Sequence, residues 1–338
     1  MKLDLVVTHW TEPWDDFRTF LIMLNMQRGI RDGECRLIFV QDGDDTGGFD
    51  PEQVLTDCII PSVVHRIPHG GVSKARNAGL DFSDADWVMF CDCDDCLYSV
   101  DSLRTILDSI DEAGDRADLL WAPFWMEMEN KDGQWRRQIQ NRNWIFIHGK
   151  VWRREWLKEH QIRFNEEIAY SEDALFNTEA GLEIVPSRIA HMKEPVYMWC
   201  KRKGSCTENP ENATRNRTHM FHSRILKPDI CIRRGQPYDA MTHAMRGILD
   251  SYYELVGGTI PEAEQETLER MVTNELIRPW YKRIRITSED MNELGIVSRN
   301  SAIRKRAYPG EEKDGQWEDY EPFTRWVAAM LEKYQEGG

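Results

Sequence analysis

Long hydrophobic runs are missing from this sequence: no apolar stretch approaches the roughly 20 residues that a membrane-spanning helix needs. An excess of positive charge is missing too, because 43 Lys and Arg stand against 58 Asp and Glu, a formal net charge of −15. An acidic protein repels polyanions, which disfavours nucleic acid as the main partner. We therefore expect a soluble protein, at most peripheral to a membrane.

A disulfide or zinc framework is missing as well, to judge from the spacing of the cysteines. The eight cysteines form no paired CxxC pattern, and we expect no secretory leader. The single CxxC, Cys93-Asp94-Asp95-Cys96, encloses two acids, which indicates a use other than a thiol metal site. We expect reduced thiols and a cytoplasmic location.

The first half of the 338 residues alternates short apolar runs with amphipathic stretches, which is typical of an α/β fold with a mostly parallel sheet. Ser73 is expected to cap a helix that follows the Gly70-Gly71 turn. The expected strands cover residues 3–8, 36–40, 62–67 and 87–91, and the helices between them carry Phe17, Phe20, Leu21 and Leu24, then Ala75, Ala78, Gly79 and Leu80.

Later segments change in character. We expect a hairpin within 118–140 that turns at Asn130–Gly133, helices at 151–160 and 172–181, and strands near 183–189 and 195–200. Beyond Pro210 the pattern predicts helices at 213–226, 238–256, 262–276, 288–306 and 321–335. The chain is therefore divided into a domain at 1–210 and a mainly helical extension at 211–338.

Three carboxylates stand within four residues, directly after an expected buried strand. Asp92, Asp94 and Asp95 would repel one another without a cation, and hard divalent ions such as Mn²⁺ or Mg²⁺ take oxygen ligands. Such an ion neutralises charge on a departing diphosphate. These acids are therefore candidate metal ligands, although a solvated acidic loop would look the same.

Further candidates for a nucleotide site follow other expected strands. Asp42 is placed to accept a hydrogen bond from a base, and Trp10 to stack on that base. Arg76 is placed to reach a ribose or a phosphate. Each also fits a structural role, as a turn acid, a core aromatic or a surface cation. Their order on successive strand ends favours the nucleotide site, because open α/β sheets bind ligands at that edge.

These motifs resemble those of the inverting family 2 glycosyltransferases, which have the GT-A fold. Gln41 departs from the family by replacing the first Asp of its Val-Asp-Asp-Gly-Ser motif. The resemblance covers about residues 3–207. Its segments are Val6 to Trp10, Val40 to Asp44, Ala75 to Gly79, Cys91 to Asp95, Gly149 to Arg154, Ile162 to Asn165, Ser171 to Asp173, and Tyr197 to Thr207.

The resemblance implies a Rossmann-like GT-A domain that transfers a sugar from a nucleotide-diphosphate sugar, a UDP-sugar before others, with a saccharide or lipid-linked acceptor. Asp173 would be the general base that an acceptor hydroxyl needs, and Glu172 would orient the acceptor or the loop. The same acid pair also suits a helix amino terminus capped by Ser171. Both interpretations can hold together.

The donor site implied by the resemblance includes further residues. Thr8 and Cys93 would line it beside the candidates already named. Lys201, Arg202 and Lys203 would clamp the diphosphate as a mobile basic loop, although a solvated charge run is an alternative. His148 and His191 are further candidates, but lone histidines more often serve packing.

Other functions remain open at this point. A nucleotidyltransferase would carry a Gly-rich basic loop where this chain has His9 to Pro13, which disfavours that class. A non-catalytic protein of the same fold would keep the binding residues. The basic stretches 215–234 and 278–306 leave room for glycosylation of modified DNA bases, but the acidity of the chain argues against it. The extension would bind the acceptor or mediate homo-oligomers.

Overall fold

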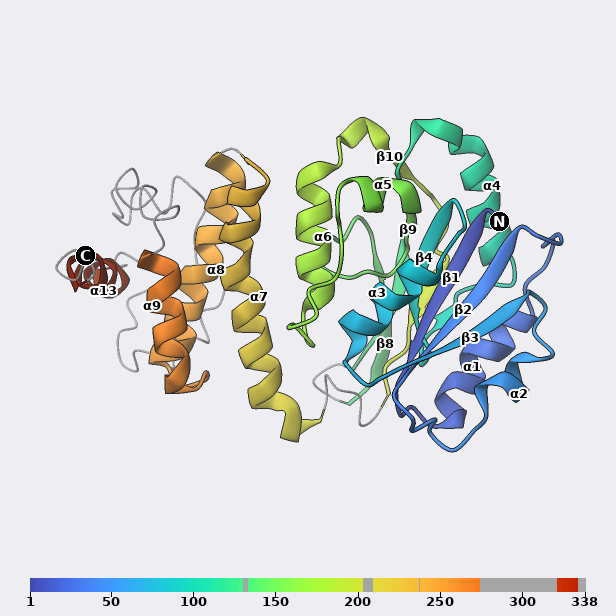
Figure 1. Cartoon of the computed structure of the whole chain (residues 1–338), viewed down its shortest axis with the longest axis horizontal. Coiled ribbons are helices and arrows are strands. Elements are labelled where there is room, and N and C mark those ends of the chain that lie inside the picture. Colours follow the sequence, from blue (N-terminus) through green and yellow to red (C-terminus); the bar gives the residue numbers. More distant parts are fainter. Residues whose placement is uncertain (130–132, 203–208, 237, 274–320, 334–338) are drawn as a thin grey trace. The chain divides into compact units, whose positions relative to one another are not determined.

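The computed structural model describes residues 1–129, 133–202, 209–236, 238–273 and 321–333 (Figure 1). The chain divides into two compact units, Met1–Cys206 and Thr207–Gly338. Among the described residues the first unit contains both strands and helices, and the second contains helices alone.

The four strands expected in the first hundred residues are all present. They are β1 (Leu3–His9), β2 (Cys35–Asp42), β3 (Ser62–Ile67) and β4 (Trp87–Asp92). In the described part of the chain the main sheet has the order β10-β6-β9-β4-β1-β2-β3, where β6 is Leu119–Trp121, β9 is Lys150–Arg153 and β10 is Ile189–His191. Among the strands described for this sheet, only β9 runs antiparallel to its neighbours. The expected mostly parallel α/β sheet is confirmed.

Helices cover both faces of this sheet. One face packs against α1 (Trp14–Asn25) and α4 (Ser102–Ala113), and the other against α3 (Val72–Phe82), α5 (Arg154–Glu159) and α6 (Glu172–Glu183). The apolar residues expected on α1 are the ones it buries: Phe17, Phe20, Leu21 and Leu24. Short helical segments lie at α2 (Pro51–Leu55), η1 (Gly114–Arg116) and η2 (Pro186–Arg188).

A smaller sheet joins the acidic loop to the end of the first unit. Its order is β5-β11-β7-β8, formed by Cys96–Leu97, Tyr197–Trp199, Phe124–Glu129 and Trp135–Gln140. Strands β7 and β8 make the expected hairpin, and residues 130–132 of its turn lie outside the described residues. Because β11 pairs with β5, the segment after residue 199 starts beside the acidic loop.

Three local expectations were wrong. Residues 151–153 belong to β9 rather than to a helix, because Val151 and Trp152 are buried in the cores on opposite faces of the sheet. Most of 183–189 is the end of α6 and η2, and β10 starts only at Ile189. Ser73 does not cap α3: Gly71 is the cap, at φ 88°, and the Ser73 hydroxyl donates to the Ile168 carbonyl.

The described part of the second unit contains α7 (Ala213–Arg233), α8 (Tyr238–Val256), α9 (Gln265–Thr273) and α13 (Glu321–Lys333), with the turns η3 (Pro210–Asn212) and η4 (Glu262–Glu264). Helix α7 runs past its expected end at 226 with Pro228 inside it. The helix expected at 288–306 lies outside the described residues. Within the described residues, no helix combines the length and apolar character that crossing a membrane requires.

Candidate functional site

The carboxyl ends of β1, β2 and β4 meet at one edge of the main sheet and carry the predicted site. Thr8 is the register partner of Asp92, and His9 is the partner of Gln41. Thr8 is buried against its neighbours, whereas Asp92 is partly exposed. The parallel sheet therefore gathers residues that lie more than eighty positions apart in the sequence.

Burial and the nearness of the other carboxylates make three negative charges in the acidic loop unfavourable. Asp95 is 0% exposed, and it accepts hydrogen bonds from the Tyr197 hydroxyl at 2.7 Å and the Cys200 amide at 2.8 Å. Burial, together with the Asp94 carboxylate, raises the pKa of Asp95 well above its usual value. Burial and Asp92 likewise raise the pKa of Asp94 to about 6. A bound cation would relieve this repulsion.

One group of side chains at this loop fits a divalent cation. Asp92, Asp95 and His148 offer ligand atoms that all lie within 4.8 Å of one another. The buried Nδ1 of His148 has no hydrogen-bond partner among the described residues, and burial lowers the pKa of His148 to about 4, which leaves a neutral imidazole. Two carboxylates and a neutral imidazole are a donor set that Mn²⁺ accepts. Sequence reasoning assigned His148 little weight, because a histidine after Ile147 is no signal without its spatial neighbours.

Asp94 points to a different partner. Its carboxylate accepts a hydrogen bond from Nε of Arg202, whose other nitrogens lie 3.3 Å from Asp16 and 3.5 Å from Glu12. Lys201 instead lies 3.4 Å from Glu129. Of the expected diphosphate clamp, Arg202 is thus surrounded by carboxylates, Lys201 pairs outside that cluster, and Lys203 lies outside the described residues.

Arg76 is a buried bridge rather than a surface cation. Its guanidinium donates to Asp92 at 2.7 Å and to Glu172 at 2.6 Å. Burial acts to raise the pKa of Asp92, but Arg76 outweighs it and the pKa lies below its usual value. Removing one partner of such a buried pair typically costs about 3–5 kcal/mol. Arg76 therefore fixes the acidic strand relative to α6.

The predicted base sits in the first turn of α6. The Asp173 carboxylate accepts from the Ala174 amide at 2.8 Å, and burial together with Glu172 raises the pKa of Asp173 to about 7. A carboxylate with a pKa near the working pH is well matched to proton transfer. Ser171 occupies the expected cap position at φ 67°, but its side chain makes no capping hydrogen bond.

The residues predicted to bind the nucleobase lie at the other end of this sheet edge, where β1 and β2 end. Asp42 is buried, and its two oxygens accept from the amides of Gly70 at 2.7 Å and Gly71 at 2.8 Å. Trp10 is 43% exposed and stacks on His69 with ring centroids 4.8 Å apart. Asp42 thus shapes the turn before α3, and Trp10 offers an indole face at the surface.

The contacts of Gln41 explain why the chain tolerates a glutamine in place of the first Asp of the family motif. The Gln41 amide nitrogen donates to the carbonyls of Trp10 at 2.9 Å and Asp45 at 2.7 Å, and its oxygen lies 2.8 Å from Nδ1 of His9. A neutral amide joins the loops after β1 and β2 where an aspartate could not donate. Sequence reasoning missed this hub, because only the fold brings its partners together.

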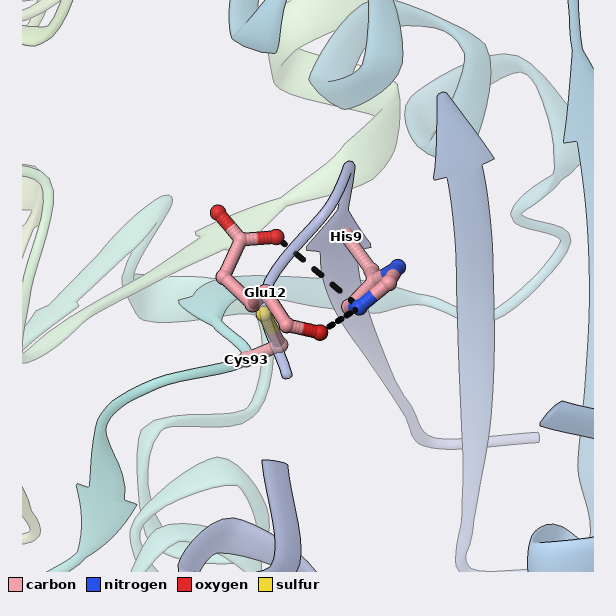
Figure 2. A group of neighbouring side chains, drawn as sticks. All are labelled: His9, Glu12 and Cys93. Atoms are coloured by element: carbon pink, nitrogen blue, oxygen red, sulfur yellow. Dashed lines mark hydrogen bonds and ion pairs between the residues drawn. The ribbon is translucent and has the colours of Figure 1, made fainter. Parts of the chain in front are cut away.

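A second group with metal-ligand chemistry joins the end of β1 and the loop after it to Cys93 of the acidic loop. Figure 2 shows His9, Glu12 and Cys93 together, with ligand atoms within 4.8 Å of one another. Both ring nitrogens of His9 already face hydrogen-bond partners, Gln41 and the Glu12 carbonyl. Burial, then Glu12, raises the pKa of the Cys93 thiol well above its usual value. These contacts, and the burial of Cys93, favour a packing role for this group.

The comparison that decides the family covers the acidic loop and most of the sheet. The family model for glycosyl transferase family 2 matches residues 14–171. Residues 14–171 are a family 2 glycosyltransferase domain. This family 2 domain contains Asp42, Arg76 and the three acids of the loop, while Trp10 and Asp173 lie just beyond the two ends of the match.

Related proteins agree with this assignment. The uncharacterized glycosyltransferase EpsJ of Bacillus subtilis (strain 168) is 23% identical, over 52% of this chain and 56% of EpsJ, so the chain matches little more than half of that relative. Crystal structures of S. aureus TarS 1–349 in complex with UDP and with UDP-GlcNAc give TM-scores of 0.58 and 0.61, at 16% and 17% identity. Both alignments cover 100% of this chain and 92% of the TarS chain. The family 2 domain therefore has the GT-A fold.

Proposed function

We propose that this chain is an inverting glycosyltransferase that moves a sugar from a UDP-sugar to the hydroxyl of a saccharide or lipid-linked acceptor. The family 2 domain supports the transfer chemistry. The TarS structures with UDP and UDP-GlcNAc support a uridine nucleotide as the donor. The acceptor class rests on the resemblance, together with an acidic chain that disfavours DNA.

The donor would lie along the edge formed by β1, β2 and β4. The exposed indole of Trp10 would stack on the base, and Thr8 and Asp42 would line the same end. Arg202 would leave its carboxylates to bind the diphosphate, with Lys201 and Lys203 in the same basic segment. Cys93, which is buried next to Asp92, would line the inner side of the donor site.

Mn²⁺ or Mg²⁺ would be held by Asp92, with Asp94 freed from Arg202 and with Asp95 and His148 beside it. When bound, the cation neutralises the negative charge that builds on the leaving diphosphate. Asp92 belongs to the group that it forms with Asp95 and His148, and it is the acid whose lowered pKa keeps it ionised. Asp92 is therefore the residue on which the metal proposal is tested.

Asp173 would take the proton of the acceptor hydroxyl as that oxygen attacks the sugar. A single displacement with the base opposite the leaving group inverts the anomeric centre. Glu172 would hold its neighbour in place through Arg76. The observation that carries the proposal is this bridge, Asp92 to Arg76 to Glu172, which joins the cation-binding acid directly to the segment of the base.

The test combines donor binding with turnover. UDP-, GDP- and CDP-sugars are screened by thermal shift with and without Mn²⁺, because a ligand that binds only the folded form raises the unfolding midpoint. We expect one UDP-sugar to raise the midpoint only with Mn²⁺. Asp92→Asn should lose that shift, whereas the exposed control Asp57→Asn should keep it.

Turnover separates the enzyme from a binding protein of the same fold. UDP release is measured for the wild type and for Asp173→Asn, which should keep the donor shift and lose release. An Asp173→Asn variant that transfers as fast as the wild type would sink the base assignment. Donor binding without release from the wild type, across saccharide acceptors, would favour the non-catalytic alternative.

A further inference from the structure

Two free thiols lie in contact where the smaller sheet meets the acidic loop. Cys96 opens β5, and Cys200 directly follows β11, the strand that pairs with β5 through Met198 opposite Cys96. Their sulfur atoms are 3.7 Å apart. Cys96 is 3% exposed and Cys200 is half-buried, so a small reagent reaches the pair from the side of Cys200.

The surroundings connect this pair to the candidate donor site. Asp95 precedes Cys96 and accepts a hydrogen bond from the backbone amide of Cys200 at 2.8 Å. Two residues after Cys200, Arg202 binds Asp94. A covalent bond between the two sulfurs would therefore fix the start of the basic segment to the acidic loop on both sides of Asp95.

We propose that Cys96 and Cys200 are a site of reversible oxidation, at which a small-molecule disulfide converts the two thiols into an intramolecular disulfide. A disulfide has an S–S distance of about 2.05 Å, so the sulfurs must approach by about 1.7 Å. The neighbouring strands already hold the two side chains in contact. Transient disulfides of this kind serve redox sensing in reducing compartments.

The exchange balances in two steps. The thiolate of Cys200 attacks one sulfur of the small disulfide, which breaks the S–S bond and releases one thiolate that takes up a proton. The thiolate of Cys96 then attacks the sulfur of Cys200 and releases the second small thiol. The protein loses two electrons and two protons, and the small disulfide is reduced to two thiols.

The consequence for the site rests on the proposed function. If Arg202 must exchange Asp94 for the diphosphate, a covalent tie two residues away restricts that exchange. The oxidised protein should then bind the UDP-sugar more weakly than the reduced protein does. Reduction should restore binding, because the tie is reversible.

The chemical test needs no donor. Reduced full-length protein is incubated with oxidised glutathione, alkylated, digested and mapped by mass spectrometry. We expect a peptide pair that joins Cys96 to Cys200, that disappears on reduction and that is absent from Cys200→Ser. The matched control Cys58→Ser, which removes a half-buried cysteine elsewhere, should form the pair as the wild type does.

Other products would overturn the inference. Glutathione that stays attached to Cys200, a Cys200–Cys206 disulfide, or a pair that stays reduced after Cys58 has reacted each contradicts it. The thermal shift given by the UDP-sugar is then compared for oxidised and reduced protein, with Cys200→Ser expected to be insensitive to the oxidant. Equal shifts in a fully cross-linked protein would refute the link to donor binding. A reduced protein that binds no donor counts against the proposed function alone.

Discussion

At the scale of the residue, the carboxylates of the site divide by environment into two roles. Arg76 keeps the pKa of Asp92 below its usual value, which keeps this carboxylate ionised near neutral pH. Burial and the neighbouring Glu172 raise the pKa of Asp173 to about 7, so this group gains and loses a proton near neutrality. Titratable groups whose environments separate their pKa values are the pattern expected of acid and base assignments.

The pH dependence of turnover tests this division. The proposed base Asp173 would act only when deprotonated, so kcat/KM should fall as the pH drops below about 7. Glu172→Gln removes the neighbouring negative charge and should lower the pKa of Asp173. The acidic limb of the pH profile of kcat/KM should therefore move to lower pH. The readout is the position of the limb in a pH profile of UDP release, since the weakened Arg76 bridge also changes its height.

A matched variant serves as the control for this experiment. Glu183→Gln changes the same residue type at the far end of α6 and should leave the limb where it is in the wild type. A limb that stays near pH 7 in Glu172→Gln would show that another group controls it.

Sequence reasoning found the chemical residues better than it found their partners. The motif identified Arg76, for which a ribose or phosphate contact is predicted, but it gave no sign of the two protein partners that the fold provides, Asp92 and Glu172. Gln41 departs from the family motif, and in the structure its buried side chain connects the loops after β1 and β2. Partners of this kind depend on which strand ends meet, and one sequence does not contain that information.

At the scale of the element, prediction succeeded where local pattern and burial agree. Strand β3 has the bounds that were expected for it, because a β-branched run stands between a proline and a turn. Strand β9 was missed because it opens with Lys150 and continues directly into α5. That lysine is buried, and its ammonium donates to the carbonyls of Asn143 and Phe146, an arrangement that polarity alone argues against.

The segment after β11 yields a prediction of its own. Arg202 pairs with Glu12, Asp16 and Asp94, and so it would compete with a divalent cation that binds Asp94. Arg202→Gln removes this competing charge, and we expect Mn²⁺ alone to bind about three- to tenfold more tightly, since one nearby unit charge at a partly exposed site contributes on the order of 1 kcal/mol. The UDP-sugar should bind more weakly, because the diphosphate loses its clamp.

A titration with Mn²⁺, followed by the electron paramagnetic resonance signal of the free ion, measures the change in Mn²⁺ affinity without turnover. Lys201→Gln is the matched control, because Lys201 pairs with Glu129 outside the acidic cluster. If both variants bind Mn²⁺ as the wild type does, Arg202 does not compete for the cation site.

At the scale of the whole molecule, each unit contains a core of its own. The first buries the residues on both faces of its main sheet. The described part of the second buries apolar side chains along α7, α8, α9 and α13, among them Phe221, Ile225, Ile248, Leu249, Leu268 and Val327. The structure divides the chain at 206/207 and the sequence pattern at 210/211. The family 2 domain lies wholly within the first unit.

This organisation predicts that the first unit carries the donor chemistry by itself. A fragment of residues 1–210 should unfold cooperatively and keep the Mn²⁺-dependent shift given by the UDP-sugar, because the strands and acids of the site lie within it. Transfer to the acceptor should be lost if the extension binds the acceptor, while slow hydrolysis of the UDP-sugar, which also releases UDP, continues.

A fragment of residues 1–190 is the control. It lacks β11 and the Tyr197 hydroxyl that binds Asp95, and it should lose both cooperative unfolding and the shift. A 1–210 fragment that fails to unfold cooperatively would mean that the extension is needed to complete the fold, and the helical unit would then be part of the catalytic domain rather than an addition to it.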